Sequence, residues 1–185
     1  MAKNAIHTVP YRRKREGRTH YKKRLELLKS DSIRLVIRRS NTATLLQFIQ
    51  YQPDGDKILL TFNSKQLSSY GWDFSKKSIP ANYLAGLIVG SKAKQLKISK
   101  AILDMGLQTP KAGSKVYAAL KGVIDAGVDV PSSSDIFPSE ERISGKHIED
   151  AKNLHESFTG YKKAKLDASK MSKVFASVKD KILSN

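Results

Sequence analysis

The sequence of 185 residues contains no cysteine, which excludes disulfide bonds and thiolate metal sites. Long hydrophobic runs are also absent. The longest, from Tyr83 to Val89, is interrupted by Gly86 and is much shorter than the roughly 20 apolar residues that span a bilayer. The first residues, Met1 to His7, lack the apolar segment of a secretion signal. We therefore expect a soluble, cytoplasmic protein with no membrane segment.

Acidic residues are scarce relative to basic ones. There are 17 Asp and Glu residues against 34 Lys and Arg residues, which gives a formal net charge of +17. Self-repulsion of this size weakens a compact fold unless a polyanion neutralises it. We therefore expect nucleic acid as the partner, with an anionic membrane surface as the alternative.

The positive charge is concentrated at the N-terminus. Residues 1–29 contain ten basic side chains and two acidic ones. Up to Arg18 the segment has almost no apolar residues to bury, and Gly17 interrupts any continuous helix. Such a segment cannot offset the entropy that it loses on ordering. We therefore predict that residues 1–18 form an extended basic arm that is disordered until it meets a partner.

One helix and three strands are predicted after the arm. Thr19 can cap the helix, whose apolar face is formed by Tyr21, Leu25 and Leu28. The strands are predicted at residues 33–39, 44–51 and 57–63. Short turns at Ser40-Asn41 and at Pro53 to Asp56 separate them, so neighbouring strands must be antiparallel. This part of the chain predicts a three-stranded meander.

The next segment predicts helices that alternate with a further strand. Helical periodicity runs from Pro80 to Ile88, a strand is predicted at 97–103, and an amphipathic helix runs from Val116 to Ile124. A strand that follows a helical crossover lies parallel to its partner. Residues 128–130 could supply a short fifth strand. The predicted fold class is α/β, with a mixed sheet on which helices pack.

A connector rich in Ser and Pro, from Pro131 to Pro138, precedes two amphipathic segments. Their apolar residues are Ile148, Ala151, Leu154 and Phe158, and then Met171, Val174, Phe175, Val178 and Ile182. Between them lie Gly160 and a basic cluster of Lys162, Lys163 and Lys165. We predict three regions: a basic arm (1–18), an α/β core that binds RNA (19–131) and a helical basic C-terminal extension (132–185).

Four blocks of the sequence occur in a distinctive order. They are YRRKREGRTHYKKRLELLKS (11–30); RLVIRRSN (34–41) followed by Gln47; GW (71–72) followed by PANYLAGL (80–87); and AGVDVP (126–131) followed by ERISGKHI (141–148). Together they resemble the archaeal form of the large-subunit ribosomal protein family that binds 5S ribosomal RNA. The resemblance covers residues 11 to about 158, whereas residues 160–185 match only in being basic and helical.

The resemblance implies a sandwich related in topology to ribonuclease H-like domains. It also implies a place in the central protuberance of the large ribosomal subunit, where the family attaches 5S RNA to the main body. The expected partners are therefore 5S ribosomal RNA, the large-subunit ribosomal RNA and neighbouring ribosomal proteins.

Two sets of residues are predicted to contact RNA. The first set belongs to the arm and the following helix and consists of Tyr11, Arg12, Arg13, Lys14, Arg15, Arg18, Tyr21, Lys22 and Arg24. Arginine can pair with phosphate through two hydrogen bonds, and tyrosine can stack on unpaired bases. The alternative interpretation is a solvated run of charge.

The second set belongs to the predicted sheet and its edge. It consists of Arg34, Arg38, Arg39, Ser40, Asn41, Gln47 and Trp72. Arg34 and Arg38 alternate with apolar residues, so with Gln47 they could form a polar face for RNA or an ordinary solvent-facing surface. Trp72 could stack on a base or fill the edge of the core.

The sequence gives little support for catalysis. A nuclease on a ribonuclease H-like fold needs several carboxylates to hold paired metal ions, and the predicted strands carry almost none. The four histidines, His7, His20, His147 and His155, lack the spacing of metal ligands. We predict no catalytic residue, no metal site and no cofactor. An RNA chaperone outside the ribosome, and less favourably a metal-dependent nuclease, are the alternative functions.

Overall fold

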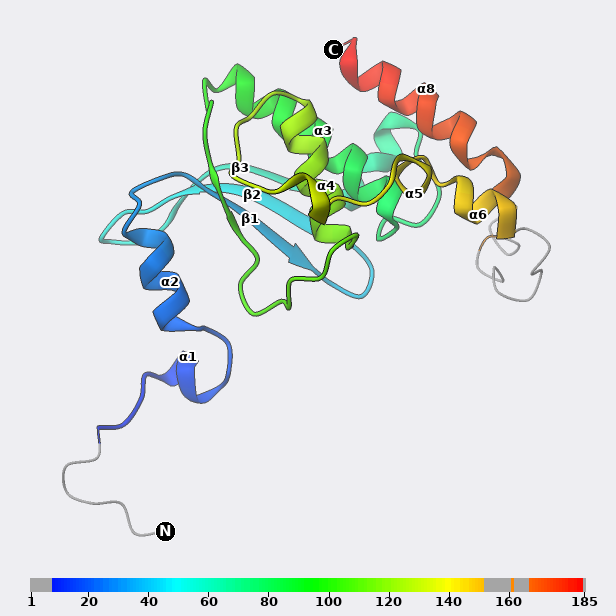
Figure 1. Ribbon diagram of the computed structural model, residues 1–185. Coiled ribbons are helices and arrows are strands. Elements are labelled where there is room, and N and C mark those ends of the chain that lie inside the picture. Colours follow the sequence, from blue (N-terminus) through cyan, green and yellow to red (C-terminus); the bar gives the residue numbers. More distant parts are fainter. Residues whose placement is uncertain (1–7, 152–160, 162–166, 185) are drawn as a thin grey trace, which may run out of the picture.

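Four strands form one mixed sheet in the order β3-β2-β1-β4 (Figure 1). The strands are β1 (Arg34–Arg39), β2 (Thr44–Gln50), β3 (Lys57–Asn63) and β4 (Ile102–Asp104). The first three form an antiparallel meander, and β4 pairs in parallel with β1. This computed structural model describes residues 8–151, 161 and 167–184. The predicted fold class is confirmed, and the strand order is compatible with a ribonuclease H-like arrangement.

The parallel strand is shorter than predicted because the preceding helix is longer. Helix α3 (Ile79–Gln95) ends in a Schellman motif. Lys97 adopts a left-handed conformation with φ of 58°, and the backbone N–H of Ile98 donates to the carbonyl oxygen of Ala93 at 2.9 Å. The chain therefore turns at Lys97, and only Ile102–Asp104 pair with β1. The predicted fifth strand at 128–130 is reduced to one parallel bridge, between Lys100 and Asp129.

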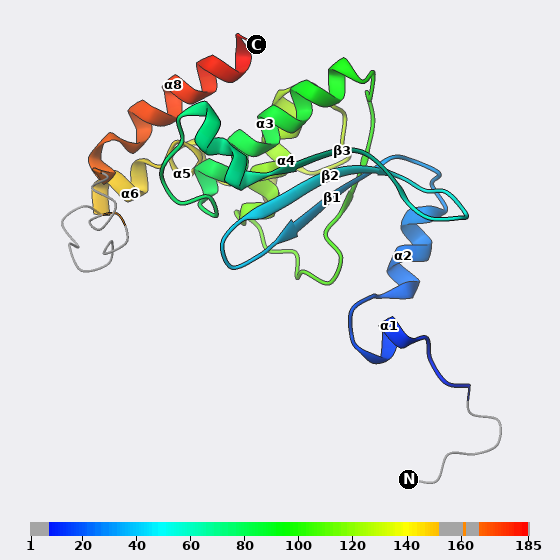
Figure 2. The ribbon, with the colours of Figure 1, turned by 180° about the vertical axis from the view of Figure 1, so that it is seen from behind.

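Helices α3 and α4 (Lys115–Asp125) cover one face of the sheet (Figures 1 and 2). The residues of β1 and β2 that face them are almost fully buried: Leu35, Ile37, Leu46 and Phe48 are each 0% exposed. Helix α3 is buried on all sides between Ile79 and Gly90, because the sheet covers one side and other helices cover the rest. The helix predicted from Pro80 to Ile88 corresponds to the N-terminal half of this central helix.

Helices α3 and α4 approach each other through glycine. A Cβ atom at Gly86 would overlap the carbonyl oxygen of Ala119, and a Cβ atom at Gly122 would overlap that of Tyr83. Gly90 lies against Val123 in the same interface. Gly86 and Gly90 therefore serve the close contact with the neighbouring helix.

The C-terminal helix belongs to the same hydrophobic core as the sheet. Helix α8 (Met171–Leu183) buries Met171, Phe175, Val178 and Ile182, four of the five residues of its predicted apolar stripe. The remaining elements are η1 (Ser64–Tyr70), η2 (Ser134–Ile136), α5 (Glu140–Ser144), α6 (Lys146–Asp150) and η4 (Ala168–Lys170). Leu154, Phe158 and the cluster of Lys162, Lys163 and Lys165 lie outside the described residues.

The basic arm and its helix lie at the end of the molecule away from α8, on the side of the sheet opposite α3 and α4 (Figures 1 and 2). Here a single-turn helix α1 (Arg12–Arg15) precedes α2 (Tyr21–Leu28). We expected no regular structure up to Arg18, yet α1 forms although it buries none of its residues. His20, and not Thr19, caps α2, since its Nδ1 accepts the backbone N–H of Lys23 at 3.1 Å. Within the described residues, no helix has the length and apolar character needed to cross a membrane.

The close contact between α3 and α4 predicts that a larger residue at Gly122 lowers the stability of the fold. Gly122→Ala should lower the free energy of unfolding by about 1–3 kcal/mol, because the added methyl group can be accommodated only by separating the two helices. Thermal and urea denaturation would measure the loss. As a control, Ser177→Thr adds a methyl group at an exposed position of α8 and should change stability by less than about 0.5 kcal/mol. Equal effects of the two substitutions would contradict this account.

Candidate nucleic-acid interface

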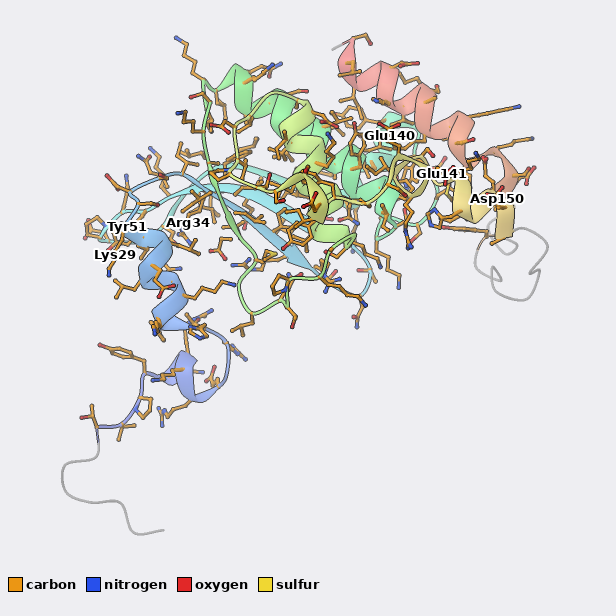
Figure 3. All side chains as sticks on the ribbon, in the orientation of Figure 1. Lys29, Arg34, Tyr51, Glu140, Glu141 and Asp150 are labelled. Carbon is orange, nitrogen blue, oxygen red and sulfur yellow. The ribbon has the colours of Figure 1, made fainter. Side chains whose placement is uncertain are left out.

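Arg34, at the start of β1, is buried in an ion-pair network. Its side chain is only 2% exposed, and it lies at the end of the sheet near α2 (Figure 3). Its Nη1 donates to Asp104 at 3.0 Å and its Nη2 to Asp56 at 2.7 Å. The structure therefore contradicts the prediction that Arg34 contacts RNA, because burial and two carboxylates occupy its guanidinium.

The network continues from the sheet to the arm. Arg38 donates from Nη2 to the other carboxylate oxygen of Asp104 at 2.8 Å. Asp56, in the turn between β2 and β3, accepts a second hydrogen bond from Arg24 of α2 at 2.9 Å. Arg24 and Arg38 keep 37% and 40% of their side chains exposed, so both remain accessible to RNA. Asp56 thereby links α2 to the sheet.

The pKa values of both carboxyl groups are lowered. Burial alone would raise the pKa of Asp104, but the hydrogen bond and charge of Arg38, the backbone N–H of Gly106 and the charge of Arg34 outweigh it. Burial would likewise raise the pKa of Asp56, but hydrogen bonds from Arg34 and Arg24 outweigh it. Both groups are therefore charged at neutral pH and balance the arginines around them.

A cavity of about 290 Å³ lies between the arm, α2 and the loop that follows β4. We call it the arm pocket. Its charged and polar lining consists of Arg13, Arg18, Thr19, His20, Lys23, Arg24, Arg38, Asp104 and Gln108. Asp104 is already paired with Arg34 and Arg38, so the pocket presents an excess of positive charge. Such a surface suits a phosphate group.

The predicted arm residues surround this pocket or extend beyond it. Glu16 pairs with Arg12 at 2.7 Å and with Arg18 at 3.2 Å, and Arg13 donates to Thr19 at 2.9 Å. Three further predicted cations are exposed on α1 and α2: Lys14, Arg15 and Lys22. These contacts tie the single-turn helix to the linker that precedes α2 and leave most of its positive charge facing solvent.

The two predicted stacking tyrosines contact each other. The ring centroids of Tyr11 and Tyr21 lie 5.3 Å apart with the planes tilted by 44°. This contact packs the start of α1 on the start of α2. Tyr11 remains 74% exposed, so a large part of its ring is still available to an unpaired base.

The sheet residues divide between surface and core. Gln47 is half-buried on the face that α3 and α4 leave open, paired across the strands with Val36 and Thr61. Trp72 is 0% exposed and packs on Phe74 with ring centroids 5.4 Å apart. The structure therefore contradicts an RNA contact by Trp72 and supports the alternative that it fills the core.

The residues predicted at the edge of the sheet are all exposed. Arg39, Ser40 and Asn41 follow one another at the end of β1. Arg39 donates from Nε to the side-chain oxygen of Gln108 at 2.7 Å. Gln108 also lines the arm pocket, so these edge residues lie close to the first set of predicted contacts.

Sequence reasoning missed several basic residues beside the predicted sites. His20 and Lys23 line the arm pocket, and their place in the block at residues 11–30 could have indicated them. Lys77 and Lys115 lie beside Arg39. No sequence signal connects these two lysines, because Lys77 lies in the loop before α3 and Lys115 begins α4, 38 positions further along the chain.

Charge is distributed unevenly over the molecule. Figure 3 shows Lys29 and Tyr51 at the end of the sheet where Arg34 is buried, next to the arm. Glu140, Glu141 and Asp150 lie at the opposite end, on and beside α5 and α6. Throughout residues 8–151, 161 and 167–184, no three His, Asp or Glu side chains gather closely enough to hold a metal ion. The arm end therefore offers one surface that suits an anionic partner.

Comparison with known proteins extends the resemblance along most of the chain. Residues 6–98 and 91–133 match the model of a family described as ribosomal large subunit proteins 60S L5 and 50S L18. The chain belongs to this family. It is 42% identical to large ribosomal subunit protein uL18 of Korarchaeum cryptofilum, over 98% of this chain and 97% of that protein. It is 47% identical to large ribosomal subunit protein uL18 of Methanothrix thermoacetophila, over 81% of this chain and 89% of that protein.

Membership of the L5/L18 family establishes the general role of the chain. It is a structural constituent of the large ribosomal subunit, and its place is the cytoplasmic ribosome. The predictions of an RNA-binding ribosomal protein and of an archaeal-type sequence are confirmed. Because the match with the Korarchaeum protein covers 98% of the chain, it includes both the arm and the C-terminal helix.

The buried ion-pair network predicts a stability loss that depends on pH. Asp104→Asn should lower the free energy of unfolding by roughly 3 kcal/mol at pH 7, because it removes a carboxylate from Arg34. Asp104 has a folded-state pKa below its ordinary value of 3.8, so its contribution is present above that pH and is lost as the pH falls through the folded-state pKa. The difference between variant and wild type should therefore shrink in acid.

Denaturant unfolding between pH 7 and pH 2 would measure this difference. Asp54→Asn is the matched control, since Asp54 is exposed in the same turn as Asp56 and should change stability by less than about 0.5 kcal/mol. A loss for Asp104→Asn that stays constant down to pH 2 would show that its carboxylate charge is not what stabilises the fold.

Proposed function

We propose that this chain binds 5S ribosomal RNA and helps attach it to the large ribosomal RNA in the central protuberance of the large subunit. The observation that carries the proposal is the arm pocket, which gathers cations from the arm, α2 and β1 around one cavity. The chain acts in this role as a structural protein and not as an enzyme.

The residues proposed to contact RNA are those predicted ones that the structure leaves accessible. They are Tyr11, Arg12, Arg13, Lys14, Arg15, Arg18, Tyr21, Lys22, Arg24, Arg38, Arg39, Ser40, Asn41 and Gln47. The arginines and lysines contact phosphates, and Tyr11 stacks on an unpaired base. Arg34 acts indirectly, since it holds the carboxylate of Asp56 that in turn holds Arg24.

The three regions of the chain have different tasks in this proposal. The arm (1–18) and the α/β core (19–131) bind 5S RNA, and the core fixes the position of the arm. Glu140, Glu141 and Asp150 of the C-terminal extension (132–185) lie at the end far from the arm (Figure 3), in a segment that also carries basic residues such as Arg142 and Lys146. That end, which has charges of both signs, is suited to contact neighbouring ribosomal proteins, while the arm end contacts the ribosomal RNAs.

The alternative is an RNA chaperone that binds RNA of any sequence, which the exposed positive charge of the arm would also support. A competition assay at roughly physiological salt separates the two. Labelled 5S RNA bound to the protein is challenged with unlabelled 5S RNA or unlabelled transfer RNA. We expect transfer RNA to require at least a tenfold higher concentration for the same displacement. Displacement at equal concentrations would favour the chaperone.

Deletion of residues 1–18 tests the contribution of the arm. The core should stay folded, because no residue of α1 is buried. Binding to 5S RNA should weaken by at least tenfold at low salt, and the slope of log affinity against log salt should decrease by roughly 3 or more, since several phosphate contacts are lost. Circular dichroism and binding titrations at several salt concentrations would measure both effects. Retained affinity with a full salt slope would exclude the arm from the interface.

A further inference from the structure

A second basic cavity lies at the end of β1, on the helical side of the sheet. Its volume is about 280 Å³, and its lining consists of Arg39, Ser40, Asn41, Thr44, Lys77 and Lys115. We call it the β1-end pocket. These residues come from the end of β1, the following turn, the start of β2, the loop before α3 and the first turn of α4. Three cations and no carboxylate line the cavity.

The topology of the fold explains why these segments meet. Strands β1 and β4 are parallel, and β3 runs in the same direction because it is separated from β1 by the antiparallel β2. Helix α3 follows β3 and helix α4 follows β4, so both helices begin at the end of the sheet where these strands finish. In sheets with parallel strands, this end is where anionic ligands commonly bind, close to helix N-termini.

The cations of this pocket have no carboxylate that neutralises them. Lys77 and Lys115 form no ion pair within 4.0 Å in the part of the chain that the structure describes. Arg39 donates from Nε to the neutral side chain of Gln108. Burial, followed by the charges of Lys77 and Arg39, lowers the pKa of Lys115. Three cations are thus held together against their mutual repulsion.

The first turn of α4 adds to this positive potential. Ser114 is the N-cap of this eleven-residue helix, but its side chain makes no capping hydrogen bond. The first backbone N–H groups of α4 are therefore free of the usual side-chain acceptor. Lys115, the first residue of the helix, brings its ammonium group to the same place. A bound anion would interact with both.

We propose that the β1-end pocket binds a backbone phosphate of RNA, on the opposite side of the sheet from the arm pocket. The inference rests on the proposed function and extends it to a second contact. Arg38 and Arg39 are neighbours in β1 whose side chains point to opposite faces of the sheet. The first lines the arm pocket and the second lines the β1-end pocket. An RNA segment that passes around the end of β1 contacts both.

The lining favours a backbone phosphate over a free nucleotide. No aromatic or large aliphatic side chain lines the β1-end pocket, so it offers no surface on which a base would stack. Ser40, Asn41 and Thr44 supply polar groups near the three cations. This set can neutralise and hydrogen-bond a phosphate whose attached sugar and base stay outside.

The test compares two double variants that lose the same charge. Lys77→Gln with Lys115→Gln removes two cations of the pocket. Lys97→Gln with Lys100→Gln is the control, since both lysines are exposed beyond the far end of α3, a 17-residue helix about 25 Å long. Binding is measured across a range of salt concentrations with 5S RNA and with an unrelated RNA duplex of about 20 base pairs.

We expect the pocket variant to bind both RNAs more weakly than the control does, by at least fivefold at low salt. Its salt slope should decrease by about 1, because the two lysines together neutralise one phosphate. Its melting temperature should be no lower than that of the control, since the substitutions relieve repulsion. Equal RNA affinities and equal salt slopes for the two variants would overturn the proposal. A lower melting temperature of the pocket variant without a change in its salt slope would also overturn it.

Titration with inorganic phosphate distinguishes the possible sources of the anion. If the wild-type pocket binds inorganic phosphate while the two variants bind RNA equally, the site serves a small anion and the proposal fails. The proposed function is judged separately, from the preference of the wild type for 5S RNA over transfer RNA. If the wild type bound transfer RNA as tightly as 5S RNA while the two variants still differed in RNA affinity, only the assignment to 5S RNA would be rejected. A wild-type protein that binds no RNA would overturn both.

Discussion

The position of the basic arm depends on one buried guanidinium. Arg34 is 2% exposed and lies between Asp104 of the sheet and Asp56 of the β2–β3 turn. A charge at such a site is tolerated only when it is paired. Asp56 also forms an ion pair with Arg24 of α2, so the network connects the sheet to this helix. Helix α2 buries none of its own residues. Its attachment to the sheet therefore relies on ion pairs more than on apolar burial.

In a protein of net charge +17, acidic and basic residues near the arm have different roles. Its few carboxylates near the arm hold arginines in place, so that the remaining cations are directed outward. The hydrophobic core, in contrast, is built from α3, α4, α8 and one face of the sheet. The hydrophobic core and the proposed RNA contacts thus use separate sets of residues, except at β1. That strand contributes Leu35 and Ile37 to the core and Arg38 and Arg39 to the two basic pockets.

Local sequence patterns predicted the strands and the two central helices, because alternation, turn residues and helical periodicity are local properties. The local patterns failed at the end of one helix and where the partner of a residue lies far along the chain. Residues 97–101 have the composition of a strand, but Lys97 closes a helix. Arg34 resembled a surface residue because its partner Asp104 lies 70 positions away. The arm cations could be predicted from their density alone, whereas the β1-end pocket required the topology that joins Lys77 to Lys115.

The shared carboxylate of Asp56 gives the β2–β3 hairpin a role beyond joining two strands. Because one oxygen of Asp56 binds arginines of both β1 and α2, the length of this turn sets the angle at which the arm leaves the domain. An insertion there would lift the carboxylate away and re-aim the arm, even with every arm residue unchanged. Relatives with longer hairpins would need another anchor to hold the same basic segment in the same direction.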